Sequence, residues 1–168
     1  AHARAHGSDL TPVFSPADEI ADSHAPPLMA EGFGVVVWTV NDPGRMTSLI
    51  DRGVDGIITD RPDLLAAVAR NHTGPGGPPI TGEGLVDRRR LDVQGHRGAR
   101  GLRPENTLPA MEAALDHLAT TLEMDVGVTA DGIAVLAHDP CLGPETCRHQ
   151  HGLPHPASGA VLIRDLRA

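Results

Sequence analysis

Residues 34–68 read GVVVWTVNDPGRMTSLIDRGVDGIITDRPDLLAAV and predict two strands that alternate with two helices. Residues 34–39 and 54–59 are apolar and rich in β-branched side chains, which is typical of strands buried on both faces of a parallel sheet. Asp42 is a good N-cap in front of a proline, and apolar residues follow it at helical spacing. Asp60 is interpreted in the same way, as the cap of the second helix, although its position after the carboxyl end of a strand would also place it at the sheet edge where catalytic residues gather. This order of elements predicts an α/β fold.

The alternation resumes in the second half of the chain. Elements are expected at residues 91–95 (strand), 106–118 (helix), 120–126 (strand) and 133–137 (short strand). The helix is predicted to face inward with Leu108, Met111, Leu115 and Leu118. Clustered Gly and Pro in residues 71–90 predict a flexible linker that separates a segment 1–70 from a segment 91–168. Residues 1–30 predict no more than a helix near residues 15–21.

Composition limits the class of protein. The 168 residues carry 14 basic side chains, all of them Arg, against 22 acidic ones, a formal charge of -8. This balance argues against a nucleic-acid partner. The sequence contains no apolar run of about 18 residues, so it predicts no transmembrane segment. The first 30 residues also lack the pattern of a signal peptide. We expect a soluble chain, cytoplasmic or secreted, whose compartment the sequence leaves open. Cys141 and Cys147 are compatible with a disulfide and equally with two thiols.

Two carboxylates fall on one predicted strand. Glu123 and Asp125 are two residues apart, so both side chains leave the same face of residues 120–126. Burying both would be costly unless a cation compensated their charge, and calcium or magnesium is the natural candidate for oxygen ligands. The alternative is an edge strand on which both acids are solvated.

Histidine and arginine residues provide further candidates. His96 follows a predicted strand, lies between glycines and precedes Arg97, whose planar guanidinium suits a phosphate. His138 ends the last predicted strand, and two histidines can share proton transfer. Each of them is equally compatible with a structural or exposed role. Glu105 can orient Arg97, accompany a metal or cap a helix, and Trp38 can form a pocket wall or pack in the core.

Three motifs occur in a specific order: GHRGARGLRPENT at residues 95–107, LEMDVGVTADG at 122–132 and LAHDP at 136–140. They resemble the amino-terminal half of the glycerophosphodiester phosphodiesterase family. The earlier stretch VVVWTVNDPGRMTSLIDRGVDGIITDRPDLL, residues 35–65, resembles the carboxyl-terminal end of the same family, with its seventh and eighth strands. The two pieces therefore stand in reversed order, and the third to sixth strands of the family have no counterpart.

The resemblance implies a TIM barrel that hydrolyses a glycerophosphodiester to glycerol phosphate and an alcohol with one divalent cation, Ca²⁺ or Mg²⁺. It implies that His96 and His138 are the catalytic acid/base pair, that Arg97 contacts the phosphate, and that Glu123 and Asp125 bind the metal. Trp38 is assigned to substrate binding and Glu105 to a supporting role. A further metal-binding carboxylate of the family has no counterpart in this sequence, so the site is expected to be incomplete.

In a closed barrel the eighth strand lies beside the first, so the family's strands 7, 8, 1 and 2 would form one arc of a partial TIM barrel. The 168 residues fall short of the roughly 250 of a full barrel. We interpret the chain as a junction between tandem barrels, a permuted barrel cut short, or a fragment. Four strands leave two open edges, which predicts self-association.

The leading function is hydrolysis of a small-molecule glycerophosphodiester, and the chain is either active itself or an inactive fragment or tandem-domain junction of such an enzyme. Two alternatives stay open from the sequence. One is a non-catalytic module that binds a phosphate or lipid headgroup, and the other is a related phosphodiesterase that acts on lysophospholipids. Headgroup preference, the choice of metal and the activity of the chain alone are not determined by these residues.

Overall fold

The computed structural model describes residues 12–74, 77–81, 84–87, 90–144, 147 and 161–167. A five-stranded parallel sheet runs in the order β1-β2-β3-β4-β5, and a separate antiparallel hairpin pairs β6 with β7. The strands are β1 (Val13–Phe14), β2 (Gly34–Val37), β3 (Gly56–Thr59), β4 (Asp92–Gly95), β5 (Thr121–Leu122), β6 (Val126–Val128) and β7 (Ala134–Leu136). The helices are α1 (Asp18–Ala30), α2 (Pro43–Asp51), α3 (Pro62–Asn71), α4 (Leu108–Asp116) and the 3-10 helix η2 (Ile163–Asp165).

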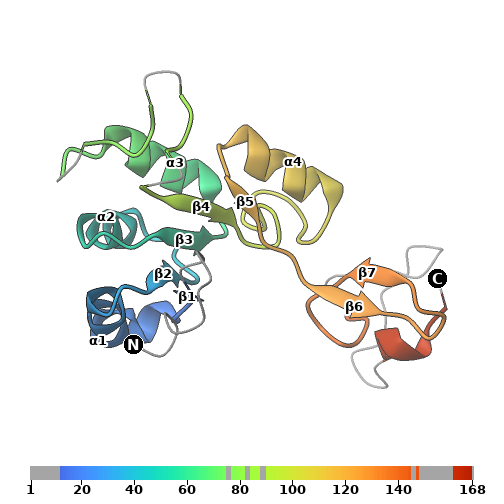
Figure 1. Ribbon diagram of the computed structural model, residues 1–168. Coiled ribbons are helices and arrows are strands. Elements are labelled where there is room, and N and C mark those ends of the chain that lie inside the picture. Colours follow the sequence, from blue (N-terminus) through green and yellow to red (C-terminus); the bar gives the residue numbers. More distant parts are fainter. Residues whose placement is uncertain are drawn as a thin grey trace.

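This arrangement confirms the predicted α/β fold with a parallel sheet. Figure 1 shows α1 to α4 in an arc around the strands, with the β6–β7 hairpin projecting away beyond β5. Within the described residues the sheet stays open, because β1 and β5 each have a strand on one side only. The open sheet agrees with the two open edges expected of an arc, and its assignment to a partial TIM barrel remains a prediction.

The predicted arc of four strands is one strand too short. β1 adds a fifth, paired in parallel with β2, and α1 follows it directly. The helix expected near residues 15–21 begins at Asp18 and continues to Ala30. It passes through Pro26 and Pro27, residues that disfavour the interior of a helix. Packing of Ala21 and Ala25 in the core accompanies this extension.

The continuous apolar runs form the centre of the sheet. All four residues of β2 are buried, and Ile57 of β3 and Val93 of β4 are fully buried beside them. Met46 and Leu49 from α2 and Leu65 from α3 cover the helical side of the same core. Burial of each large apolar side chain stabilises the fold by about 1.5–3 kcal/mol. The short strands are thus held by the helices that pack on them.

Helix α2 begins as predicted, whereas α4 presents a different face. Asp42 caps α2 by accepting a hydrogen bond from the backbone N of Arg45 at 2.7 Å. In α4, Met111 is buried, but Leu108 and Leu115 are 77% and 55% exposed, so their predicted inward orientation is wrong. The helix packs instead through Ala110 and Ala114, which are buried together with Met111. Small side chains allow α4 to approach the loop after β4 closely.

The predicted linker, residues 71–90, is partly described. Asn71 ends α3, and Ile80 forms an isolated antiparallel bridge with Val86. The side chain of Ile80 is 7% exposed and belongs to the core cluster. Part of this segment therefore packs on the α/β unit, while its flexibility stays a prediction.

Two remaining expectations concern disulfides and membranes. Cys141 and Cys147, both in the described part of the chain, are not joined by a disulfide. Among the described residues, every helix is too short or too polar to cross a bilayer.

Candidate active site

A cavity of about 320 Å³ lies where β2 to β5 end. Its lining consists of Ser15, Trp38, Ile58, His96, Arg97, Glu123, Asp125 and His138. The carboxyl ends of parallel strands are where α/β proteins place their ligands. All the site residues predicted from the sequence line this cavity except Glu105. Glu105 instead accepts a hydrogen bond from the side chain of Arg97. The fold brings together the two halves of the chain here, although the roles of these residues stay predictions.

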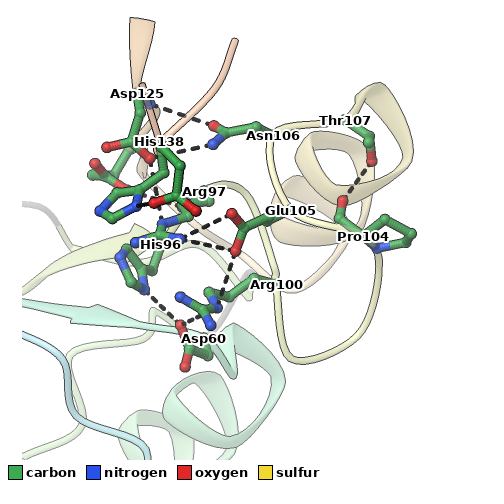
Figure 2. Close-up of polar contacts among 12 residues, drawn as sticks. Asp60, His96, Arg97, Arg100, Pro104, Glu105, Asn106, Thr107, Asp125 and His138 are labelled. Carbon is green, nitrogen blue, oxygen red and sulfur yellow. Dashed lines mark hydrogen bonds and ion pairs between the residues drawn. The ribbon is translucent and has the colours of Figure 1, made fainter. Parts of the chain in front are cut away.

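His96 is paired with the partly buried carboxylate of Asp60. Its Nδ1 lies 2.6 Å from Oδ1 of Asp60, and the two side chains are 14% and 21% exposed. Asn41 donates from Nδ2 to Oδ2 of Asp60 at 2.8 Å and accepts from the Asp60 backbone N at 2.9 Å. Figure 2 shows Asp60 beneath His96 and beside Arg100. The carboxylate is therefore fixed from two sides.

The ionisation of Asp60 follows from these contacts. Burial opposes the charge of this carboxylate, but hydrogen bonds from His96 and Asn41 outweigh burial and lower the pKa of Asp60 below its ordinary value. An ionised Asp60 accepts a hydrogen bond from Nδ1–H of His96, which leaves Nε2 as the proton-accepting nitrogen of a neutral ring. This arrangement suits His96 to act as a general base.

Arg97 is surrounded by carboxylates. Arg97 is 9% exposed, and its Nη1 donates to both carboxylate oxygens of Glu105 at 2.9 Å. Its Nε lies 3.3 Å from Oδ2 of Asp125 but makes no hydrogen bond, and its backbone N donates to Oε2 of Glu123 at 2.9 Å. The expected contact between Glu105 and Arg97 is thus present, as Figure 2 shows.

Glu123 and Asp125 lie beyond the strand on which they were predicted. β5 ends at Leu122 and β6 begins at Val126, so the single strand predicted for residues 120–126 is wrong in its bounds. Both acids nevertheless line the same cavity and are partly buried, whereas Met124 between them is 42% exposed, which agrees with the predicted common side and contradicts full solvation. Asn106 donates from Nδ2 to Oδ2 of Asp125 at 3.2 Å.

His138 approaches the cavity from the hairpin. It follows β7, is 47% exposed at its side chain, and places Nδ1 2.8 Å from Oδ1 of Asp139. The backbone N of Ala137 donates to the carbonyl of Asp125 at 3.1 Å, which ties the end of the hairpin to the acidic segment. The two histidines therefore differ: His96 is enclosed, whereas His138 is accessible to solvent.

Trp38 forms one wall of the cavity, as one of the two sequence interpretations expected. The strand ends at Val37, one residue earlier, and Trp38 is 46% exposed. Its indole Nε1 donates to the carbonyl of Ser15 at 2.8 Å, which fixes the ring beside the cavity.

Asp60 and Asn41 were not among the predicted site residues. The interpretation of Asp60 as a helix cap is wrong, because Arg61 occupies the N-cap position of α3 and no side chain caps that helix. The backbone N of Arg61 is bound instead by Oγ1 of Thr59 at 3.0 Å. The available signal was the place of Asp60 directly after the carboxyl end of a strand.

A divalent cation can be tested against the donors present. Among the described residues, no group of three or more His, Cys, Asp or Glu side chains is arranged to hold a metal. Glu123 and Asp125 do supply two carboxylates at one cavity. This set fits an ion such as Mg²⁺, which is commonly bound by one or two carboxylates together with water and substrate phosphate oxygens.

Comparison with known proteins adds independent information. The model of the "Glycerophosphoryl diester phosphodiesterase family" matches residues 2–64 and 96–167. Glycerophosphodiester phosphodiesterase 1 of Homo sapiens is 46% identical over 55 residues, which are 33% of this chain and 17% of that protein. The probable glycerophosphodiester phosphodiesterase 2 of Mycobacterium tuberculosis (strain ATCC 25618 / H37Rv) is 47% identical over 57 residues, 34% of this chain and 19% of that protein.

A third relative has a name that states a different activity. Lysophospholipase D GDPD3 of Mus musculus is 41% identical over 49 residues, which are 29% of this chain and 15% of that protein. The matches thus span less than a fifth of the length of each of these relatives. No solved structure matches the chain.

Proposed function

The chain belongs to the glycerophosphoryl diester phosphodiesterase family, and from this premise we propose that its cavity hydrolyses glycerophosphodiesters to glycerol phosphate and an alcohol. The observation that carries the proposal is the meeting of His96, Arg97 and His138 with two acids around one cavity. An arginine for the phosphate and two histidines for proton transfer are the groups this reaction requires.

The two histidines can divide the proton transfers. His96, held by Asp60, accepts the proton of a glycerol hydroxyl as its oxygen attacks phosphorus. His138 donates a proton to the oxygen of the departing alcohol as its bond to phosphorus breaks. A cyclic phosphate results, and water opens it with the histidines in exchanged roles. Each step forms one P–O bond and breaks another, so no oxidant or further reactant is needed.

Arg97 and the acids support the charge of the phosphate. Arg97 lines the cavity beside Asp125, and its guanidinium is the group we propose to contact an anionic oxygen of the phosphate there. Glu123 and Asp125 are the residues we propose to hold a divalent cation, Ca²⁺ or Mg²⁺. When bound, such an ion would supply positive charge beside the non-bridging oxygens of the phosphate.

The test is release of glycerol phosphate from glycerophosphocholine by this chain, with Mg²⁺, with Ca²⁺ and with a chelator. We expect release to depend on the cation and to fall by at least about 100-fold when Glu123→Gln and Asp125→Asn are combined, because losing the charge removes the cation. The matched control is Glu112→Gln with Asp116→Asn on α4, two exposed acids that do not line the cavity. Undiminished release in the chelator would contradict the metal proposal.

Binding without turnover would favour the competing function. If the chain binds glycerophosphocholine but releases no glycerol phosphate with either cation, a phosphate-binding module describes it better than an enzyme. Fluorescence of Trp38 is a suitable readout, since this is the one Trp of the sequence and lines the cavity. Both outcomes can be distinguished on the same sample.

We further propose that the chain self-associates through the outer strands of its sheet. β1 and β5 each lack a second neighbour within the described residues, and Val13 and Phe14 of β1 are 59% and 45% exposed. Unpaired backbone groups beside exposed apolar side chains favour pairing with another chain. Sedimentation velocity at increasing concentration is expected to show species heavier than 17.6 kDa. A single species of that mass at all concentrations would contradict this proposal.

A further inference from the structure

A second cavity adjoins the candidate active site and shares one residue with it. Its volume is about 390 Å³, and it lies between β6, the segment after β7 and η2. His138 lines this cavity as well as the first one. The volume falls in the range of small-molecule sites. A substrate held in the first cavity can therefore extend past His138 into the second.

The chemistry indicates which part of the substrate extends there. In the proposed reaction, His138 gives its proton to the oxygen of the departing alcohol, so that oxygen must lie within hydrogen-bonding distance of the imidazole. The carbon skeleton of the alcohol continues from the same oxygen, away from phosphorus. Because His138 lines both cavities, we infer that this skeleton extends toward the second cavity.

The walls of the second cavity are mainly apolar. Val126 and Val128 contribute from β6, and Leu162 and Ile163 contribute from the segment that forms η2. Ile163 is 6% exposed and packs against Gly127, where an added Cβ would lie 3.2 Å from its Cγ2. These side chains offer contact to methylene groups and no hydrogen bonds.

The charged groups at this cavity are opposite in sign and give a cationic alcohol such as choline no clear advantage. Asp139 lines it and attracts a quaternary ammonium group, although its Oδ1 lies 2.8 Å from Nδ1 of His138. Arg164 also lines it, and its guanidinium repels the same group. The mainly apolar remainder of the lining favours an uncharged, apolar alcohol.

The exposed surface beside the cavity continues the apolar character. Val126 and Val128, which line the cavity, are 59% and 55% exposed, and Leu136 is 40% exposed. Val126 is the cross-strand partner of Leu136, so both side chains lie on the same face of the hairpin. A chain too long for the cavity would find further apolar contact there.

We propose that this second cavity binds an alkyl or acyl chain carried by the departing alcohol of the phosphodiester. This inference rests on the proposed function, because His138, its proton donor, sets the direction in which the departing alcohol extends. It makes Val126, Val128, Leu162 and Ile163 determinants of substrate choice. The preferred substrate is a glycerophosphodiester whose second alcohol is apolar.

The test compares three synthetic substrates, the glycerophosphate diesters of methanol, butanol and octanol, on this chain with Mg²⁺. We expect kcat/KM to rise from methyl to octyl by on the order of 100-fold, since each fully buried methylene contributes about fourfold and part of the chain stays exposed. Equal rates for the three diesters would overturn the proposal. Lysophosphatidylcholine, which has its chain on the glycerol side, serves as a fourth substrate, and its preference over the octyl diester would overturn the proposal too.

Paired variants locate the effect. Val128→Asp places a charge in the cavity wall and is expected to reduce the octyl-to-methyl ratio at least tenfold. Ile133→Asp is the matched control, because Ile133 lies on the same hairpin, is 49% exposed and is not part of the cavity lining. An equal loss in both variants would overturn the assignment to the cavity.

Binding separates this inference from the proposed function. If none of the diesters is hydrolysed, the hydrolytic function fails. The dissociation constants of the octyl and methyl diesters, measured by calorimetry, then still test the cavity. Tighter binding of the octyl diester that Val128→Asp removes supports the inference, whereas equal binding of both overturns it.

Discussion

Replacing His96 by Ala is expected to lower the release of glycerol phosphate by about 100-fold to 10,000-fold, the contribution typical of a positioned acid or base. The ring is 14% exposed at the cavity, and its Nδ1 is bound by Asp60, so Ala removes both the base and its support. The measurement is the rate with saturating glycerophosphocholine. His24→Ala, at an exposed position on α1, is the control and should retain full activity. Unchanged turnover in His96→Ala would exclude His96 as the base.

Asp60→Asn tests the positioning of His96. The amide can still meet the imidazole but no longer favours the tautomer with a proton on Nδ1, so we expect a loss of up to about 10,000-fold, comparable to that of His96→Ala. A loss of less than about tenfold would contradict this supporting role of Asp60.

The pH dependence of stability provides a second readout for Asp60. Its pKa in the folded chain lies below the ordinary value, so folding favours the ionised form. This contribution is complete above about pH 4, where the unfolded carboxyl is also ionised, and disappears as the pH falls through the lower folded pKa. The difference in urea midpoint between the wild type and Asp60→Asn should therefore narrow below about pH 4.

The sequence predicted those elements whose signals are local. The apolar runs that form β2 and β3 identify buried strands by themselves, and Asp42 with the following Pro identifies the start of α2. β1 is only two residues long and depends on pairing with β2, and no local sequence pattern indicates that pairing. α1 was missed beyond residue 21 because two prolines in its interior indicate an end rather than a continuation.

Prediction of the site residues has the same limit, because contacts between distant residues leave no local pattern in the sequence. His96, Arg97 and the two acids were identified as residue types that phosphate chemistry uses, and the fold brings them to one cavity. Asp60 was assigned to a helix cap because an Asp after a strand and before a helix supports both roles equally. The choice depends on His96, which lies 36 residues away in the chain. Only the pairing of β3 with β4 places the two side chains together.

Gly98→Ala is expected to destabilise the fold by about 3–4 kcal/mol, the largest stability effect we predict for a single methyl group. Gly98 has φ of +85°, and a Cβ added there would lie 2.6 Å from the carbonyl carbon and 2.8 Å from the carbonyl oxygen of Ala110. The left-handed backbone costs an L-residue roughly 1–2 kcal/mol, and overpacking against a backbone typically adds about 1–3 kcal/mol. α4 must move to relieve the contact.

Gly132→Ala separates the two contributions. Gly132 has nearly the same φ, +83°, but an added Cβ would have nothing within 4 Å, so only the backbone term of about 1–2 kcal/mol applies. The urea midpoints of both variants at neutral pH measure the difference. Equal destabilisation would show that α4 yields without cost and would contradict the close packing of Ala110.

Measuring activity in Gly98→Ala and Gly132→Ala tests whether the loop after β4 also matters for the site. The backbone N of Gly98 donates to the carbonyl of Glu123 at 3.2 Å, directly after Arg97 donates to the side chain of the same residue. Movement of this loop therefore shifts Arg97 and Glu123 together. We expect Gly98→Ala to reduce release of glycerol phosphate even under conditions in which the chain remains folded, whereas Gly132→Ala should not. The close approach of α4 to the loop after β4 is thus a requirement of the site as well as of the fold.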